Sequence, residues 1–270
     1  MKIIAIDYDG VIVDSIMDSL FVSHNAYLRL YGAEHKQYFG GTLFTFQNWP
    51  EKKKKYAQRI QEYRLLRPYI RMASDYGLIQ KLMEEGRKIP NQQAFDHYRE
   101  VTDFDFKRYH DAFYQERMRL QQEDFQSWLK LVPPYYGIVT GIRRFITEGY
   151  KVMIATSNRR EIVARNFQPQ YYNIPIRPKD ILDHRFGSDK SMQMTYIHEQ
   201  FATPYQDICF IDDQLAHLKQ TRKLGIKPFL AGWSYATEQQ KKEAKTLGMP
   251  VIRTEQVFYQ MVRNYLKETN

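Results

Sequence analysis

Two aspartates near the N-terminus, Asp7 and Asp9, are the residues best suited to chemistry in this 270-residue chain. They follow the apolar run Lys2–Ile6 and precede Gly10. Residues two apart on a strand point to the same side, so both carboxylates would face one site. Such a pair repels unless a cation or a proton separates its members, and it can bind Mg²⁺ or divide the roles of nucleophile and general acid/base. A surface turn with an Asx cap explains the same residues without chemistry.

Thr156, Ser157 and Asn158 form a second polar cluster, directly after the apolar run that begins at Lys151. A hydroxyl group and exposed backbone N–H groups at a helix start can bind a phosphate oxygen. Lys190 stands at the start of another expected helix, where the helix dipole favours an anion nearby. Ordinary helix capping and a surface lysine are the structural alternatives for these two features.

Asp212 and Asp213 end a third apolar run, Ile208–Ile211. Adjacent acids at a strand end can supply a metal ligand and a second carboxylate that supports it. Helix N-capping is the alternative for this pair as well.

Short apolar runs followed by helical patterns predict the elements that carry these residues. Continuous hydrophobic runs that alternate with helices are typical of a doubly wound parallel sheet, an α/β fold. The expected strands are Lys2–Ile6, Lys151–Thr156, Ile208–Ile211, Pro228–Ala231 and Pro250–Ile252. The expected helices between and after them are Ile138–Glu148, Arg159–Asn166, Ser191–Phe201, Gln214–Leu224, Thr237–Leu247 and Thr254–Lys267.

The stretch between the first and second strands is too long for a simple crossover connection. Residues 16–131 show helical patterns rich in Tyr, Phe, Arg and Lys, and they are followed by the Pro/Gly-containing segment 132–137. We therefore expect a core domain made of residues 1–15 and 132–270, with an inserted all-α domain at 16–131. The lysine run 52–55 within it is interpreted as a solvated helix face.

Taken together, the four polar clusters all fall at the carboxyl ends of strands of one sheet, where doubly wound folds bind ligands. In order and in residue type, Asp7–Ser15, Thr156–Asn158, Lys190 and Asp212-Asp213 resemble the four motifs of the haloacid dehalogenase superfamily. The resemblance covers both segments of the core, and residues 16–131 resemble the helical cap of that superfamily in position.

The resemblance implies a role for each polar cluster. Asp7 would be the nucleophile that forms an aspartyl phosphate, and Asp9 would be the general acid/base. Mg²⁺ would be held by Asp7, the backbone carbonyl of Asp9, and Asp213, with Asp212 contributing through water. The phosphate-binding residues would be Thr156, Ser157, Asn158 and Lys190.

Asp9 also separates chemistries within the superfamily, because dehalogenases and phosphonate-cleaving members lack a carboxylate at this position. The sequence departs from the common pattern elsewhere. Val11 replaces a frequent Thr, and Lys190 is not followed by Pro, which leaves Lys179 as a poorer candidate for the motif lysine. His217, four residues after Asp213, is expected on a helix surface rather than at the metal.

The net charge of +9 and the 21 tyrosines raise the possibility of a nucleic-acid partner. The excess is spread evenly, however: residues 16–130 carry 19 bases and 15 acids, and the rest carry 21 and 16. This distribution argues against a dedicated nucleic-acid-binding domain and fits a small anionic substrate. The single cysteine, Cys209, lies in an apolar run and fits a reducing compartment.

The sequence therefore predicts a cytoplasmic, Mg²⁺-dependent phosphatase that hydrolyses a small phosphorylated metabolite, with no membrane partner. No apolar run approaches the ~18 residues of a spanning helix. A sugar phosphomutase on the same core is one alternative, and a nucleic-acid-associated end phosphatase or binding protein is another. The substrate and the oligomeric state are left open.

Overall fold

The computed structural model describes residues 1–32, 38–187 and 189–268 of the chain. The chain divides into two compact units, Met1–Asp14 with Pro133–Asn270, and Ser15–Val132. We call them the sheet unit and the helical unit. Asp14 and Pro133 are hydrogen-bonded through their backbones, which brings the two ends of the sheet unit's interrupted chain together.

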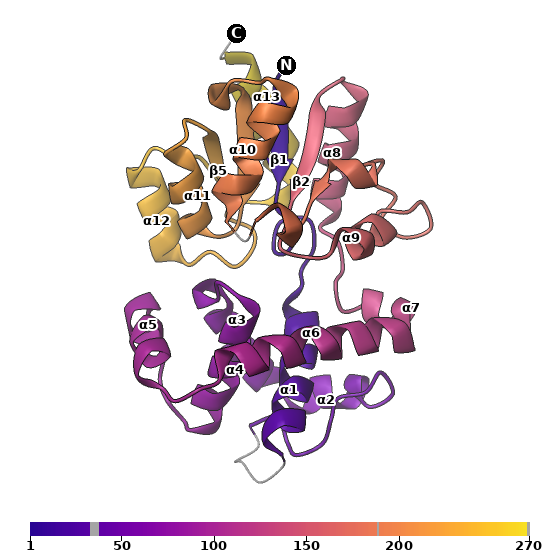
Figure 1. Cartoon of the computed structure of the whole chain (residues 1–270), viewed down its shortest axis with the longest axis vertical. Coiled ribbons are helices and arrows are strands. Elements are labelled where there is room, and N and C mark those ends of the chain that lie inside the picture. Colours follow the sequence, from indigo (N-terminus) through magenta and orange to yellow (C-terminus); the bar gives the residue numbers. More distant parts are fainter. Residues whose placement is uncertain (33–37, 188, 269–270) are drawn as a thin grey trace. The chain divides into compact units, whose positions relative to one another are not determined.

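The sheet unit is built on six parallel strands in the order β3-β2-β1-β4-β5-β6 (Figure 1). The strands are β1 (Ile3–Ile6), β2 (Lys151–Ala155), β3 (Ile181–Leu182), β4 (Ile208–Asp212), β5 (Lys227–Ala231) and β6 (Val251–Ile252). This confirms the doubly wound α/β core. The edge strand β3 was not predicted, because a two-residue strand leaves no hydrophobic run to recognise.

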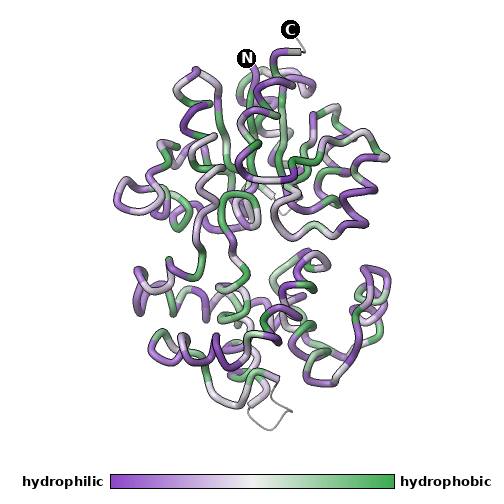
Figure 2. The backbone as a smooth tube through the Cα atoms, turned by 180° about the vertical axis from the view of Figure 1, so that it is seen from behind, coloured by the Kyte–Doolittle hydropathy of each residue, from purple (hydrophilic) through white to green (hydrophobic). Residues whose placement is uncertain are grey.

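Helices cover both faces of this sheet. Alternate strand residues such as Ile3, Ala5 and Phe210 share one core cluster with residues of α10, α11 and α12. On the other side, α8 contacts β2 and packs closely against α13, where Phe258 fills the space beside Gly141. The hydrophobic colouring in Figure 2 follows these central strands, as expected for strands that are buried on both faces.

The helix bounds in the sheet unit lie close to those expected from the sequence. They are α8 (Tyr136–Thr147), α9 (Arg160–Asn166), α10 (Lys190–Phe201), α11 (Leu215–Arg222), α12 (Glu238–Thr246) and α13 (Phe258–Glu268). The last helix starts later than predicted, because Glu255–Val257 forms a separate 3-10 turn.

The regular secondary structure described in the helical unit is entirely helical. Its elements are α1 (Ile16–Tyr31), α2 (Trp49–Lys55), α3 (Ala57–Leu66), the 3-10 turn Arg67–Tyr69, α4 (Ala73–Glu84), α5 (Gln92–Val101), α6 (Phe106–Glu123) and α7 (Phe125–Leu129). α1, α4 and α6 pack against one another. Their core is aromatic; for example, the rings of Tyr76 and Phe113 stack with centroids 5.4 Å apart.

The lysine run ends α2, and Lys53, Lys54 and Lys55 are exposed. Cys209 is buried in β4 with a free thiol. Across the described residues, the helices are either too short or too polar to span a bilayer.

Candidate active site

Adjacent strands β2, β1 and β4 bring the predicted chemical residues to one edge of the sheet. Asp7 follows β1, and its backbone N–H donates to the carbonyl of Ile211 in β4 at 2.9 Å. Asp212 is the last residue of β4, and Thr156 follows β2. Residues from three segments far apart in the sequence therefore meet where parallel strands end, which is the usual ligand edge of such sheets.

Asp7 and Lys190 form a buried ion pair at this edge. The Nζ atom of Lys190, the first residue of α10, donates to Oδ1 of Asp7 at 2.6 Å and also to the carbonyl of Ala155. Burial raises the pKa of Asp7 to about 6, with Lys190 opposing and the negative charges of Asp212 and Asp9 adding to the rise. Burial would lower the pKa of Lys190, but the negative charges of Asp7, Asp212 and Asp9 outweigh burial and raise that pKa. Lys190 thus stays a cation beside a carboxylate that is costly to keep charged.

Asp7, Asp212 and Asp213 form a group of three buried acids. Each offers a carboxylate oxygen, and these oxygens lie within 4.8 Å of one another. Hard oxygen ligands converging in this way suit Mg²⁺, so the residues fit the predicted metal. Gly10 is part of the fit: it has φ +80°, and a Cβ there would lie 2.8 Å from the Asp213 carboxyl carbon. A side chain at position 10 would displace that carboxylate.

The turn after Asp7 directs Asp9 toward a different partner. Backbone bonds from Ile12 and Val13 to the carbonyl of Tyr8 close this turn. The carboxylate of Asp9 accepts a hydrogen bond from Nδ2 of Asn158 at 3.1 Å and is not in the three-acid group. Its side chain is therefore separated from the metal-type ligands, as the acid/base role would require.

The Thr156–Asn158 turn is held from two sides. Thr156 is fully buried, and its Oγ1 accepts from the backbone N–H of Asn158 at 3.0 Å. Gln193 in α10 donates from Nε2 to the carbonyl of Thr156 at 2.9 Å. Ser157 is exposed, so of the four predicted phosphate-binding residues it is the one open to solvent.

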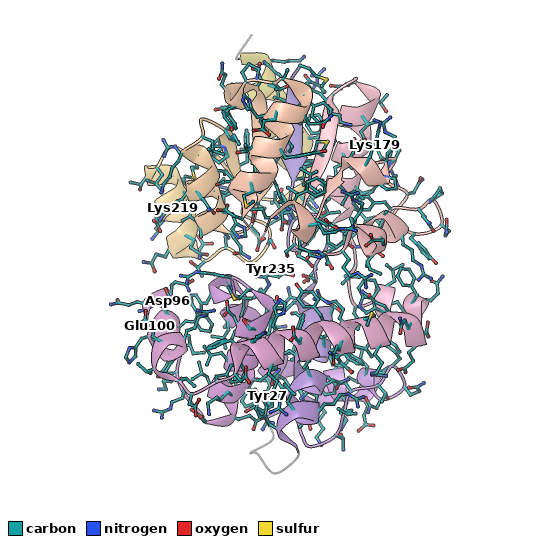
Figure 3. All side chains as sticks on the ribbon, viewed as in Figure 1. Tyr27, Asp96, Glu100, Lys179, Lys219 and Tyr235 are labelled. Atoms are coloured by element: carbon teal, nitrogen blue, oxygen red, sulfur yellow. The ribbon has the colours of Figure 1, made fainter. Side chains whose placement is uncertain are left out.

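The alternative motif lysine, Lys179, is exposed in the 3-10 turn before β3. Figure 3 shows Lys179 and Lys219 on opposite sides of the sheet unit. The ion pair with Asp7 therefore distinguishes Lys190 from Lys179.

Several residues that contact this site were not identified from the sequence as contributors. Gln193 lies three residues after Lys190, on the same side of α10. His217 lies on α11 and is not among the three acids that could hold a metal, but its side chain is only 23% exposed and its Nδ1 lies 2.9 Å from Oδ2 of Asp212, a contact that was not predicted. The four-residue spacing from Asp213 was visible in the sequence, but it did not reveal which acid the ring would contact.

A loop after β5 contacts the chain near the end of the first motif. The Tyr235 hydroxyl, labelled in Figure 3, donates to Oδ1 of Asp14 at 2.7 Å. The ring of Trp233 in the same loop packs at 6.4 Å, centroid to centroid, from that of Tyr135. These contacts hold the ends of the two chain segments that leave and re-enter the sheet unit.

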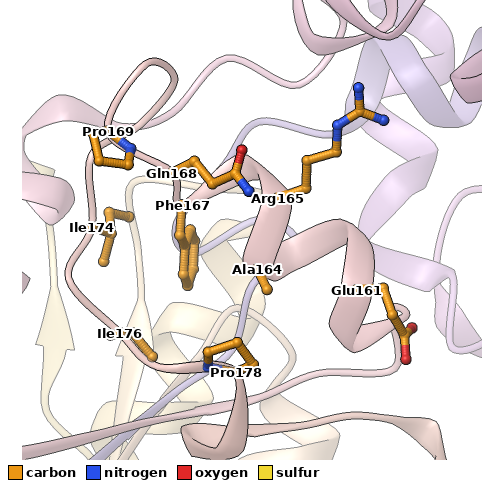
Figure 4. Close-up of a pocket in the computed structure, with 9 residues that line it drawn as sticks. All are labelled: Glu161, Ala164, Arg165, Phe167, Gln168, Pro169, Ile174, Ile176 and Pro178. Carbon is orange, nitrogen blue, oxygen red and sulfur yellow. The ribbon is translucent and has the colours of Figure 1, made fainter.

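A separate pocket of about 480 Å³ lies beside α9 and the loop after it (Figure 4). Its lining is mostly apolar and includes Phe167, Ile174 and Ile176, but none of the predicted site residues. Phe167 packs against the ring of Tyr8 with centroids 6.0 Å apart. The pocket is thus linked to the first motif through the contact of Phe167 with Tyr8, but it does not contain the three acids.

Comparisons with known proteins identify the fold. No family model matches the sequence, and no curated protein matches it significantly. Among solved structures, a protein assigned as a phosphoglycolate phosphatase from Lactobacillus delbrueckii subsp. bulgaricus aligns with a TM-score of 0.65 and 12% identity, covering 97% of this chain and 99% of the other. A haloacid dehalogenase-like family hydrolase from Streptococcus pneumoniae aligns with a TM-score of 0.56 and 11% identity, covering 98% of each chain.

A protein assigned as a β-phosphoglucomutase from Thermotoga maritima also aligns, with a TM-score of 0.51 and 14% identity over 98% of this chain and 99% of the other. The chain therefore has the fold of haloacid dehalogenase-like hydrolases. The predicted resemblance is confirmed at the level of fold.

Proposed function

We propose that this chain is a Mg²⁺-dependent phosphatase that hydrolyses a small phosphorylated metabolite through an aspartyl phosphate on Asp7. The observation that carries the proposal is the buried contact of Asp7 with Lys190, beside Asp212 and Asp213, at the ligand edge of the sheet. A fold of this kind hosts several chemistries, so the proposal rests on the site and not on the fold.

In the first step, a carboxylate oxygen of Asp7 attacks the phosphorus and the bond to the leaving oxygen breaks. Asp9 donates a proton to that oxygen, so the product leaves as an alcohol. In the second step, Asp9 takes a proton from water, the water oxygen attacks the phosphorus, and the bond to Asp7 breaks. Inorganic phosphate is released and both aspartates return to their starting protonation states.

The remaining residues bind and orient. Lys190 fixes the attacking carboxylate and offsets negative charge near the phosphate, and Thr156 would donate its hydroxyl to a phosphate oxygen. Asn158 holds Asp9 in place. Mg²⁺, held by Asp7, Asp213 and the backbone carbonyl of Asp9, with Asp212 in support, would supply charge neutralisation and orientation of the phosphate.

We further propose that residues 16–131 act as the cap that determines substrate choice, in a cytoplasmic enzyme. The even charge distribution supports an anionic small-molecule substrate over a nucleic acid. The structural similarity to a protein assigned as a β-phosphoglucomutase supports a second candidate function. In that function, the phosphoryl group is transferred from Asp7 to a sugar hydroxyl.

A phosphate-release screen tests the proposal. Sugar phosphates, phosphoglycolate, nucleotides and phosphorylated amino acids are supplied with Mg²⁺ or with EDTA. We expect Mg²⁺-dependent release from a subset of them, and at least a ~10³-fold loss in Asp7→Asn, since the nucleophile is removed. Asp103→Asn, the same change at an exposed acid of the helical unit, serves as the matched control.

Wild-type turnover in Asp7→Asn would eliminate the nucleophile assignment. Isomerised sugar phosphates without net phosphate release would favour the phosphomutase. Neither activity, combined with salt-sensitive binding of an oligonucleotide, would favour the nucleic-acid alternative.

A further inference from the structure

We propose that His217 is a positioning residue: by donating a hydrogen bond from Nδ1 to Asp212, it orients that carboxylate for metal binding. The inference deepens the proposed function, because it assigns a support for the same site. It concerns a histidine of α11 that was expected on the helix surface and to which the proposed mechanism assigns no role.

Two donors determine the orientation of the Asp212 carboxylate. Oδ2 faces Nδ1 of His217 at 2.9 Å, and Oδ1 accepts the backbone N–H of Gln214 at 2.8 Å. Both donors lie within five residues of Asp212 along the chain, so a single short segment holds the group. Each carboxylate oxygen can accept about two hydrogen bonds or metal contacts, so one lone pair on each remains available for a ligand.

The bond also determines which ring nitrogen carries a proton. An ionised carboxylate only accepts hydrogen bonds, so the proton between the two groups lies on Nδ1.

α11 is itself firmly anchored. Leu218 and Thr221 are fully buried, and the Thr221 hydroxyl donates to the carbonyl of His217. Gln220, also in α11, donates to Asp189, the residue that caps the helix carrying Lys190. The donor to Asp212 therefore comes from a rigid element, which is what a positioning contact needs.

The hydrogen-bond partners of metal-binding carboxylates typically change metal affinity by about 10–100-fold when removed. If His217 served only to hold α11 in place, its loss would lower stability and leave Mg²⁺ affinity unchanged. Mg²⁺ affinity is therefore the property that separates the two roles.

The experiment compares His217→Asn with His217→Leu. The amide nitrogen of Asn is as many bonds from the backbone as Nδ1 of His, so Asn keeps a donor at nearly the same place, whereas Leu fills space without one. Arg222→Gln, an exposed change on the same helix, is the control. Two readouts are taken on the full chain: the rise in Tm on titrating MgCl₂, and the Mg²⁺ concentration that half-saturates phosphate release.

For His217→Leu we expect Mg²⁺ affinity about 10–100-fold weaker in both readouts, with the KM for the phosphorylated substrate near wild type at saturating Mg²⁺. His217→Asn should lie within a few-fold of wild type, as should Arg222→Gln. Equal Mg²⁺ affinity in wild type and His217→Leu would overturn the inference, as would an Asn variant as weak as the Leu variant.

The Tm readout keeps this test separate from the proposed function. If the wild-type chain binds Mg²⁺ but releases phosphate from no substrate, the proposed function fails and the Tm comparison still decides the role of His217. If Mg²⁺ does not raise the Tm of the wild-type chain, the metal site and the inference both fail.

Discussion

The two units handle buried acids in opposite ways. In the helical unit each buried acid has its own arginine: Asp18 pairs with Arg117 at 2.6 Å, Asp75 with Arg99 at 3.0 Å, and Glu116 with Arg119 at 2.7 Å. In the sheet unit, Asp7, Asp212 and Asp213 instead bring their oxygens within 4.8 Å of one another, and Lys190 pairs with Asp7.

The pKa directions express the same contrast. Burial would raise the pKa of Glu116, but hydrogen bonds and charges from Arg119, Asn25 and Arg29 hold it below its ordinary value. The pKa of Asp7 is raised instead, with burial the largest cause and Asp212 and Asp9 contributing. The charge of a paired acid is offset within the fold, whereas crowded acids repel one another until a bound cation neutralises them.

Crowding is not a general property of the sheet unit. Asp183, also at the end of a strand, is fully buried and accepts hydrogen bonds from the Arg185 side chain and the backbone N–H of Arg160. Arg185 thus gives it the kind of arginine partner found in the helical unit. The crowded carboxylates Asp7, Asp212 and Asp213 lie at the edge formed by β1 and β4, and this crowding marks the candidate site.

The largest expected effect comes from removing the cation. In Lys190→Met, Asp7 loses its buried partner, so phosphate release should fall at least ~10³-fold and the free energy of unfolding by about 3–5 kcal/mol in EDTA. Steady-state kinetics and urea titration measure the two effects. Lys179→Met, at an exposed lysine, is the control, and equal losses in both variants would contradict the assignment of Lys190.

The matching experiment in the helical unit removes a paired charge. Glu116→Gln deprives Arg119, Arg29 and Asn25 of a shared acceptor, so the free energy of unfolding should fall by about 3 kcal/mol. Urea titration measures the loss. Glu100→Gln, at an exposed residue of α5 labelled in Figure 3, should change stability by less than about 0.5 kcal/mol. An unchanged stability in Glu116→Gln would remove the contrast between the units.

The smallest effect has the opposite sign. In Asp7→Asn the same acid-to-amide change relieves crowding, so without metal the free energy of unfolding should rise by about 1–2 kcal/mol although the enzyme is inactive. Urea titration in EDTA at neutral pH measures it, beside Asp103→Asn. A variant less stable than wild type would mean that Asp7 is paired as completely as Glu116.

Much of the core could be predicted because buried parallel strands are continuous apolar runs and their polar ends are adjacent in sequence. Lys2–Ile6, Lys151–Thr156 and Ile208–Ile211 were recognisable for that reason. β3 is too short to leave such a pattern, and the delayed start of α13 follows from a local turn that its composition does not signal.

The sequence by itself determined which residues could do chemistry and that they follow strands, because residue type and hydrophobic period are local properties. Only the tertiary structure decided which strands are neighbours and therefore which side chains meet. It placed Lys190 rather than Lys179 on Asp7, and it turned His217 toward Asp212 rather than toward solvent. The contact of Lys190 with Asp7 depends on strand order and on how α10 packs on the sheet, which are long-range properties that no local pattern encodes. The contact of His217 with Asp212 spans only five residues and depends on how the chain turns from β4 into α11.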